Sequence, residues 1–381
     1  MTKLAFFGHN VADAAIRRRV EAFQADGIEV QAYMARRGPA AQPDWKWVDL
    51  GETRDGAFVQ RIRSVFRSAD VAADDEDLAS ADVIYARNLD MLATAFLAKR
   101  KRKLAAPVIY ECLDVHRLMV RKDPIGMALR IIERALLKRS RALVVSSPGF
   151  LKNYFEPRHG GLYEAFLVEN RLAEGMDYGA RPVARAHDAS APLRLGWVGV
   201  LRCGRSFQLL CQLADAFPDR LEIHLHGKPA HNEIDAFDAN VAARANMTYH
   251  GPYKAPEDLG RIYDSIDVVW AGDFMEAGYN SVWLLPNRIY EGGYYTTAPI
   301  APAGTQTAAW IDTHKTGLLV AEPLEKTLPE AVSALIRNRK PLEEAETRLR
   351  ALPDTVFIQP KGEMEKLLSA ALVSSKAEVT A

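Results

Sequence analysis

The sequence contains few cysteines and no long apolar run. It has only three cysteines among 381 residues, Cys112, Cys203 and Cys211, and no C-x-x-C pair. This number and spacing argue against both a disulfide framework and a zinc site. No stretch of 18 apolar residues occurs, and the N-terminal MTKLAFFGHN lacks the features of a secretory signal. We therefore expect a cytoplasmic protein that at most touches a membrane surface.

The sequence also has no excess of positive or negative charge. The chain carries 49 Lys and Arg against 49 Asp and Glu, so no overall field draws it to nucleic acid, and we expect no nucleic-acid partner. The first 170 residues nevertheless hold 27 Lys and Arg against 22 Asp and Glu. The length and the 48% hydrophobic share are typical of a globular protein with two domains.

Short apolar runs alternate with helix-length amphipathic segments, which is the pattern of parallel sheets covered by helices. We predict strands at 4–7, 28–33, 83–85, 107–111, 142–146 and 165–168, and a second series at 193–198, 221–226, 247–250, 268–271, 298–301 and 317–320. The clearest helices are predicted at 11–26, 124–139, 205–216, 256–265 and 286–295. The 124–139 helix has Asp123 as its N-cap and Pro124 at its first position.

The pattern predicts an α/β fold with two tandem Rossmann-like, doubly wound domains. The expected boundaries are 1–172 and 193–350 for the domains, 173–192 for a linker rich in Ala, Arg and Pro, and 351–381 for a helical tail. Two such domains should place the carboxyl ends of both sheets at an interdomain cleft, where a ligand is expected to bind.

The usual nucleotide-binding motifs are absent. No G-x-G-x-x-G follows the first strand, and no G-x-x-x-x-G-K-[ST] occurs. Gly8 still ends the first strand, where the backbone can approach a ligand or simply turn. In VIYECLDVH, Asp114 and His116 follow a predicted strand and can assist a substrate hydroxyl by acid–base or electrostatic means. The alternative is that Asp114 caps a turn and His116 is a surface histidine.

Cations gather at several places in the sequence. In WVGVLRCGRS, Arg202 and Arg205 follow the strand-ending Gly199, which is typical of a diphosphate clamp or of an ordinary exposed loop. Residues 99–103 are five successive cations, consistent with an exposed turn. Arg130, Arg134 and Lys138 recur every four residues beside apolar side chains, which suits either anionic lipid headgroups or a solvated helix face. Tyr253 in YHGPY can face a nucleobase or be half buried in a turn.

The segment LPNRIYEGG at 285–293 places a cation and a carboxylate on one face of a helix. Together with the tandem α/β domains and the run TGLLV at 316–320, it resembles the nucleotide-sugar half of GT-B glycosyltransferases, specifically glycosyltransferase family 4. The family pattern is matched at Pro286, Arg288, Glu291, Pro299 and Gly304, with good coverage of 193–322 and looser coverage of 1–170.

The resemblance implies a nucleoside diphosphate sugar as donor, bound by 193–350, and an acceptor bound by 1–172. Glu291 would bind the ribose hydroxyls, and Arg202 and Arg288, with help from Arg205, would hold the diphosphate. Main-chain amides near the donor sugar would come from 304–306. The implied donor-binding set is Gly8, Gly199, Arg202, Arg205, Tyr253, Asn287, Arg288, Glu291, Gly304, Thr305 and Gln306. The implied catalytic pair is Asp114 and His116.

The sequence departs from the family pattern at several positions. Arg288 replaces the usual lysine, and Gln306 and Thr307 lie where a glutamate is common. Trp283 stands where many members have the first glutamate of an E-x7-E pair, so that contact is either absent or supplied by another residue such as Glu276 or Asn280. No D-x-D pair is placed for a divalent ion, and we predict a transfer without metal or cofactor.

The resemblance and the charge pattern together predict a retaining hexosyltransferase of exopolysaccharide synthesis. Its donor is expected to be a UDP- or GDP-linked sugar, and its acceptor a glycan or polyprenyl-linked glycan at the cytoplasmic face of the inner membrane. The alternatives are a GT-B nucleotide-sugar epimerase, which needs no acceptor, and a non-catalytic subunit that binds sugar nucleotides.

Overall fold

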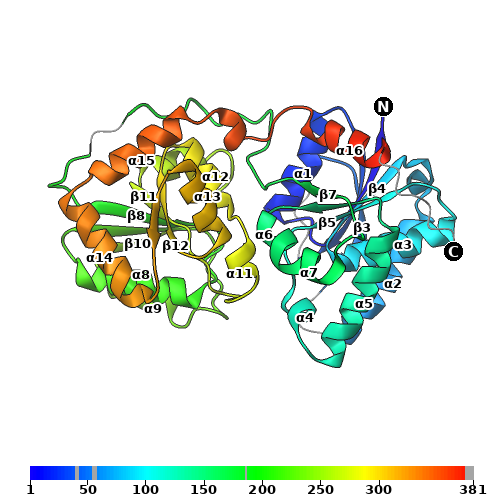
Figure 1. Ribbon diagram of the computed structural model, residues 1–381, viewed down its shortest axis with the longest axis horizontal. Helices are drawn as coiled ribbons and strands as arrows, with labels where there is room; N and C mark the ends of the chain where they lie inside the picture. Colours follow the sequence, from blue (N-terminus) through cyan, green and yellow to red (C-terminus); the bar gives the residue numbers. More distant parts are fainter. Residues whose placement is uncertain (39–42, 54–57, 185–186, 374–381) are drawn as a thin grey trace. The chain divides into compact units, whose positions relative to one another are not determined.

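The computed structural model describes residues 1–38, 43–53, 58–184 and 187–373, without the side chains of 58–61. The chain forms two compact units (Figure 1). The first joins Met1–Glu169 to the C-terminal segment that starts at Gln359, and the second is Asn170–Ile358. Each unit holds one parallel sheet covered by helices. The predicted fold class, two doubly wound α/β domains, is confirmed.

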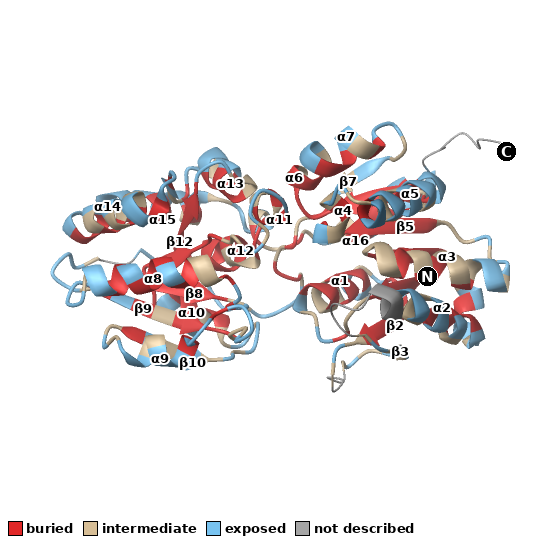
Figure 2. Cartoon of the chain, turned by 90° about the horizontal axis from the view of Figure 1, so that it is seen from below, coloured by how far each residue is buried: buried red, intermediate tan, exposed pale blue. Residues whose placement is uncertain are grey.

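The first unit is built on a seven-stranded parallel sheet in the order β3-β2-β1-β4-β5-β6-β7. Its strands are β1 (Lys3–Gly8), β2 (Glu29–Arg36), β3 (Trp47–Glu52), β4 (Val83–Arg87), β5 (Val108–Cys112), β6 (Ala142–Val145) and β7 (Ala165–Leu167). The strand order reverses between β1 and β4, which are neighbours in the sheet. The central strands are buried on both faces (Figure 2), which explains why they read as continuous apolar runs.

Eight α-helices belong to the described part of the first unit: α1 (Ala14–Ala25), α2 (Phe58–Asp74), α3 (Leu89–Arg102), α4 (Arg117–Val120), α5 (Pro124–Arg139), α6 (Pro148–Phe150), α7 (Glu156–His159) and α16 (Glu363–Val373). The predicted capping of α5 is confirmed, because the Asp123 carboxylate accepts a hydrogen bond from the Gly126 amide at 2.9 Å. The predicted strands missed β3, a six-residue strand at the edge of the sheet.

The second unit has a six-stranded parallel sheet in the order β10-β9-β8-β11-β12-β13. Its strands are β8 (Leu193–Val198), β9 (Leu221–His226), β10 (Met247–Gly251), β11 (Val268–Trp270), β12 (Ala298–Pro302) and β13 (Leu318–Val320). Its α-helices are α8 (Gly204–Ala216), α9 (Phe237–Ala242), α10 (Leu259–Asp264), α11 (Asn280–Trp283), α12 (Asn287–Tyr294), α13 (Gln306–His314), α14 (Leu324–Arg337) and α15 (Lys340–Ala351). Here the strand order reverses between β8 and β11.

The segment predicted as a linker, 173–192, is part of the second unit. The Arg181 guanidinium donates hydrogen bonds to the carbonyl oxygens of Leu349 and Leu352, at 2.6 and 2.7 Å. These contacts hold the segment against the end of α15. Composition alone predicted a linker here. The two carbonyl groups that accept hydrogen bonds from Arg181 lie far along the chain, so no local pattern in the sequence indicates these contacts. Residues 185–186 of the predicted linker lie outside the described residues.

The C-terminal segment 351–373 is divided between the two units and ends in the helix α16. Phe357 is fully buried in the core of the second unit. From Gln359 onward the chain packs on the first unit, where the Asp26 carboxylate accepts hydrogen bonds from the Gly362 and Met364 amides at 2.6 and 2.8 Å. The Arg141 guanidinium donates to carbonyl oxygens near the end of α16. Residues 374–381 lie outside the described part.

None of the helices in the described ranges combines the length and the apolar character that a membrane span requires.

Candidate functional site

The reversal of strand order in the second unit places an arginine beside a glycine. Loops diverge at such a reversal and leave a crevice at the carboxyl ends of the strands, where ligands bind in doubly wound sheets. Gly199 follows β8 there with φ +119°. Arg288, on α12, donates from Nη1 to the carbonyl oxygen of Trp270 at 3.1 Å. Its Nη2 would lie 4.0 Å from a Cβ added to Gly199. Two residues of the expected donor-binding set, Arg288 and Gly199, therefore lie beside each other.

Glu291 lies one turn after Arg288, but its carboxylate is buried. Only 3% of Glu291 is exposed, and Oε2 accepts a hydrogen bond from the Tyr263 hydroxyl at 3.1 Å. Burial and the Glu291 carboxylate together raise the pKa of Tyr263 well above its usual value, so the hydroxyl stays protonated. Pattern reasoning gave Arg288 and Glu291 equal access to a ligand, whereas the structure holds the carboxylate inside the unit.

The two arginines after β8 differ in their surroundings. Arg202 is exposed, with Nη2 3.8 Å from an Asp273 carboxylate oxygen. Arg205 instead donates four hydrogen bonds to Glu322 and Glu325, at 2.8 to 3.2 Å. These hydrogen bonds raise the pKa of Arg205. The prediction that Arg205 helps to hold a diphosphate is thus corrected, because two carboxylates already occupy its guanidinium.

The remaining donor candidates lie in loops and helix ends of the second unit. Gly304 has φ +78°, and Thr305 caps α13 by accepting a hydrogen bond from the Ala308 amide at 3.0 Å. Gln306 is the first residue of that helix, so its first-turn amides can bind an anion. Asn287 starts α12 and accepts a hydrogen bond from the Asn170 amide. Tyr253 is half buried against the core.

The expected replacements for the missing glutamate lie near α11. Trp283 is 7% exposed and packs edge-on against Tyr279, so it is a core residue. Glu276 is half buried, and Asn280 is buried at the first position of α11.

In the first unit, the strand-order reversal brings together residues that pattern analysis had only partly identified. His9 follows β1 and Asn88 follows β4, and Asn88 Nδ2 lies 3.4 Å from His9 Nδ1. Asp114 follows β5 and is exposed. Burial lowers the pKa of His9, and the carboxylates of Asp13 and Asp114 partly offset this effect. Both His9 and Asn88 were missed. The stretch GHN directly after the first strand was a usable signal for His9, but it does not include Asn88.

Gly8 and His116 have structural roles in this part of the unit. A Cβ on Gly8 would collide with the Met34 sulfur and crowd Ile16, so close packing explains this glycine. His116 is exposed and caps α4, since its Nδ1 accepts a hydrogen bond from the Leu118 amide at 3.2 Å.

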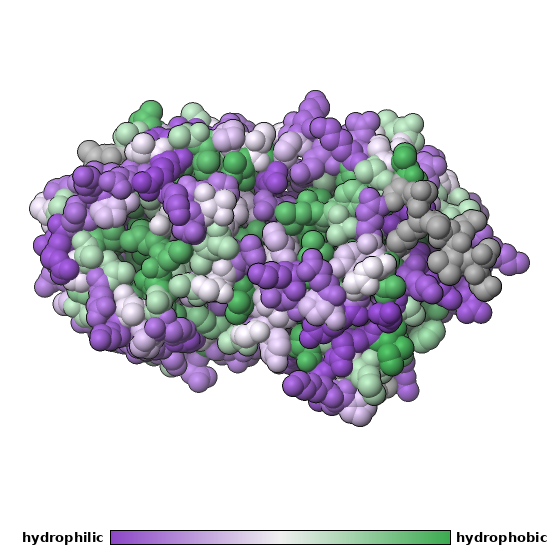
Figure 3. Space-filling model, viewed as in Figure 1, coloured by the Kyte–Doolittle hydropathy of each residue, from purple (hydrophilic) through white to green (hydrophobic). Residues whose placement is uncertain are grey.

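A cavity of about 1030 Å³ extends from these residues over α3, between α2 and α5. Polar groups mark one end, where His9, Asn88, Asp114 and His116 lie. Its walls are apolar and include Val65, Phe66, Phe96, Leu97, Ile132 and Leu136. Cations line it at the C-terminal ends of α3 and α5, at Lys99, Arg100, Lys103 and Arg139. Charged and apolar side chains also lie side by side on the surface around α4 and α5 (Figure 3).

The predicted cationic stripe on α5 is corrected in part. Arg130 donates from Nη1 to the carbonyl oxygens of Met119 and Arg121, at 2.8 and 2.6 Å. Arg134 donates to the Arg158 carbonyl oxygen at 3.2 Å. The cations at 99–103 close a helix rather than a turn, where they complement the helix dipole.

A buried ion cluster supports the loops at this end of the first sheet. Arg87 donates to both oxygens of Glu111, at 2.6 and 3.0 Å, and Arg19 donates to Glu111 Oε1 at 3.0 Å. All three side chains are at most 2% exposed. Burial alone would raise the pKa of Glu111, but the two guanidiniums hold it below its usual value. Arg87 directly precedes Asn88, so the cluster fixes the backbone next to His9.

Known proteins resemble this chain in sequence and in fold. No known protein-family profile matches the chain. The succinoglycan biosynthesis protein ExoL of Rhizobium meliloti is 39% identical over 345 residues, which are 89% of this chain and 86% of that protein. Anabaena HepE, solved in complex with UDP and glucose, superposes with a TM-score of 0.70 at 13% identity, over 97% of this chain and 100% of that one.

Two further solved structures resemble the whole chain. Sucrose-phosphate synthase of Thermosynechococcus elongatus has a TM-score of 0.73 at 16% identity, over 98% of this chain and 100% of that one. WaaG, a glycosyltransferase involved in lipopolysaccharide biosynthesis, has a TM-score of 0.61 at 11% identity, over 98% and 100%. At these identities the structures establish the fold, which is the predicted GT-B fold.

Proposed function

The chain belongs to the family of the succinoglycan biosynthesis protein ExoL, and from this premise we propose that it is a glycosyltransferase of exopolysaccharide synthesis. It moves a hexose from a nucleoside diphosphate sugar to a saccharide acceptor. The observation that carries the proposal is the guanidinium of Arg288 beside Gly199, where the strand order of the second sheet reverses. UDP in the HepE structure supports a uridine donor.

The second unit binds the donor in this proposal. The bond between the anomeric carbon and the diphosphate oxygen breaks, and negative charge develops on the leaving diphosphate. Arg288, with Arg202 and the first-turn amides of α13, stabilises that charge, so the reaction needs no metal ion. In this proposal the Glu291 carboxylate accepts hydrogen bonds from the ribose hydroxyls, which requires that this buried group become accessible when the donor binds.

The first unit binds the acceptor. The exposed Asp114 carboxylate accepts a hydrogen bond from the acceptor hydroxyl. The oxygen of that hydroxyl forms the new bond to the anomeric carbon, and its proton passes to the leaving diphosphate. Neutral His9 is kept in place by the Asn88 amide. Protonation of His9 would set an N–H against the Asn88 NH₂ and disturb this arrangement. His9 is therefore a positioning residue.

Asp114→Asn is expected to lower kcat about 10- to 100-fold, the worth of one hydrogen bond to a charged group. The variant should also shift the acid limb of the pH profile to lower pH, because Asp114 raises the pKa of His9. Initial rates from pH 5 to 8 measure both effects. Asp90→Asn, which changes another carboxylate lining the same cavity, is the matched control. If the acid limb of the pH profile does not shift in Asp114→Asn, Asp114 does not influence His9, and the assignment of these two residues to the acceptor site is wrong.

The acceptor in this proposal is a lipid-linked glycan. The polar end of the cavity receives the sugar, the apolar walls over α3 receive a polyprenyl chain, and the cations at the helix ends meet anionic headgroups. The protein would then work on the cytoplasmic face of the inner membrane as a peripheral protein. An epimerase or a sugar-nucleotide sensor has no use for such a cavity.

Ala93→Trp is expected to raise KM for a polyprenyl-linked acceptor at least tenfold, because Ala93 lines the cavity and the indole fills it. KM for a short soluble acceptor should change little. Ala128→Trp on the exposed face of α5 is the control, since Ala128 does not line the cavity. Equal effects on both acceptors would show that the cavity does not take the lipid.

The proposed function is tested with purified protein, sugar nucleotides and polyprenyl-linked saccharides in the presence of a chelator. Transfer to the acceptor is expected, and NMR of the product is expected to show a retained anomeric configuration. Conversion of the donor in the absence of acceptor would favour an epimerase, and binding without turnover would favour a non-catalytic subunit.

A further inference from the structure

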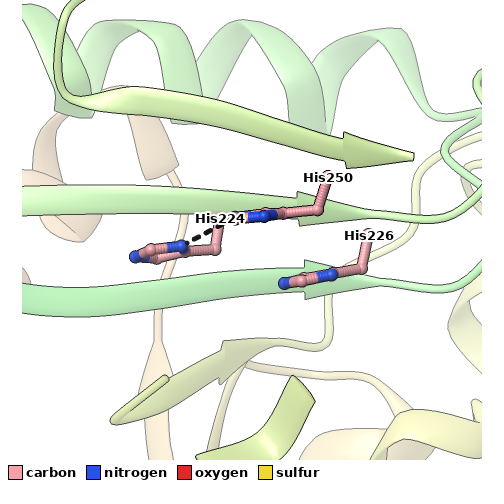
Figure 4. A group of neighbouring side chains, drawn as sticks. All are labelled: His224, His226 and His250. Atoms are coloured by element: carbon pink, nitrogen blue, oxygen red, sulfur yellow. Dashed lines mark hydrogen bonds between the residues drawn. The ribbon is translucent and has the colours of Figure 1, made fainter. Parts of the chain in front are cut away.

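Three histidines of the second unit lie close together on two neighbouring strands (Figure 4). His224 and His226 are two residues apart on β9, so their side chains leave the same face of the strand. His250 lies on β10, the neighbouring parallel strand at the edge of the sheet. Two histidines on one strand and a third on its neighbour are a His₃ ligand set of the kind that binds zinc in β-sheets.

The ring nitrogens of the three side chains are close to one another. His224 Nδ1 lies 3.0 Å from His250 Nε2, and one nitrogen from each ring lies within 4.8 Å of the others. The rings are stacked, with centroids 4.3 Å apart for His226 and His250 and 5.2 Å apart for His224 and His250. In a tetrahedral zinc site with bonds of 2.0 to 2.1 Å, nitrogens are about 3.3 Å apart. The side chains must rotate out of the stack before the three nitrogens can point at one ion.

Unsatisfied hydrogen bonding points to a ligand at this cluster. His226 is 3% exposed, and its Nε2 has no hydrogen-bond partner among the described residues. A buried nitrogen in this state costs free energy unless something binds it. A metal ion would use that lone pair and replace the contact between His224 and His250.

The surroundings fit a cation with one open coordination position. Glu222 lies on the same face of β9, with Oε2 3.6 Å from His224 Nε2, as in the carboxylate–histidine pairs that orient metal ligands. From α10 and the residue before it, Arg261 and Asp258 contribute opposite charges near His226. His250 is exposed at the sheet edge, so an ion and a water molecule can enter.

We propose that His224, His226 and His250 form a binding site for a divalent transition-metal ion of the zinc class. Imidazole nitrogen is the ligand type that suits Zn²⁺, Cu²⁺ and Ni²⁺. The site is structural in its effect. It ties the carboxyl ends of β9 and β10 together, where Gly227 N–H already donates to the Gly251 carbonyl oxygen at 2.8 Å. Gly227 also packs directly on the Gly199 backbone, so the ion braces the loop that carries Gly199.

The test is Zn²⁺ binding by the full, tag-free chain, measured by competition with a chromophoric chelator. One ion per chain is expected, and Co²⁺ should give the absorption bands of a tetrahedral site. His224→Gln and His250→Gln are each expected to weaken Zn²⁺ binding about 100-fold, and Glu222→Gln about tenfold. Both histidines are at least partly exposed, so these variants should fold, as circular dichroism can verify.

His231→Gln is the matched control, because His231 is an exposed histidine of the same unit outside the cluster. It should leave the affinity unchanged. Absence of saturable binding at one ion per chain would overturn the proposal, and so would binding that persists in the His224→Gln/His250→Gln double variant. Neither result depends on glycosyl transfer.

Discussion

Replacing Arg288 by alanine is expected to lower kcat/KM about 30- to 1000-fold. This range corresponds to a loss of about 2 to 4 kcal/mol of transition-state stabilisation, the usual cost of removing one group that stabilises developing charge. Arg288 is held beside Gly199 by its hydrogen bond to the Trp270 carbonyl, so its charge is preorganised. Initial rates with a sugar nucleotide and a lipid-linked acceptor measure the loss.

Arg205→Ala is the matched control for this prediction. It removes a cation from the same unit, but one whose guanidinium is bonded to Glu322 and Glu325. We expect kcat/KM to stay within about threefold, since exposed ion pairs contribute at most about 1 kcal/mol. The kcat/KM of Arg288→Lys should lie between the values of Arg288→Ala and the unchanged protein. Lysine keeps the positive charge but lacks the forked N–H donors of the guanidinium. Equal losses in Arg288→Ala and Arg205→Ala would contradict the assignment of Arg288.

Glu111→Ala is expected to destabilise the first unit by about 3 to 5 kcal/mol. Removing one partner of a buried ion cluster leaves the others charged and desolvated. Here Arg19 and Arg87 would both lose their carboxylate, and Arg87 supports the backbone that leads to Asn88. Urea denaturation measures the change in the free energy of unfolding. The unfolding is monitored by hydrogen exchange in peptides from each unit, because the two units need not unfold together.

A surface pair provides the comparison for Glu111. Asp77→Ala breaks the exposed contact with Lys46 and should leave the urea midpoint unchanged. The Glu111 effect should also depend on pH. Because the folded-state pKa of Glu111 is lowered, its contribution is present above the unfolded pKa of about 4.3 and is lost as the pH falls through the lower folded value. A Glu111→Ala midpoint equal to that of Asp77→Ala would refute the role of the cluster.

Local signals in the sequence predicted local structure well. Asp123 followed by Pro124 predicts the start of α5, and the structure begins the helix there. Apolar runs predict the buried central strands of both sheets because parallel strands are covered on both faces. The edge strand β3 lacks such a run, since Leu50 is its only buried residue, and it was missed.

The sequence could predict only those features of the site that depend on residues close together in the chain. Arg205 and Arg288 look alike as cations near glycines, and only the structure shows that Glu322 and Glu325, more than 100 residues away, bind the first. His9 and Asn88 are 79 residues apart, so their contact has no local pattern. The burial of Glu291 depends on Tyr263, which belongs to a different helix.

The return of the C-terminal helix to the first unit has a practical consequence. The helix α16 packs on the first unit, where its amides bind Asp26 at the end of α1. A recombinant fragment ending at Glu169 would therefore expose the hydrophobic surface that α16 covers. Such a fragment calls for the peptide 359–373 to be co-expressed or grafted ahead of Met1.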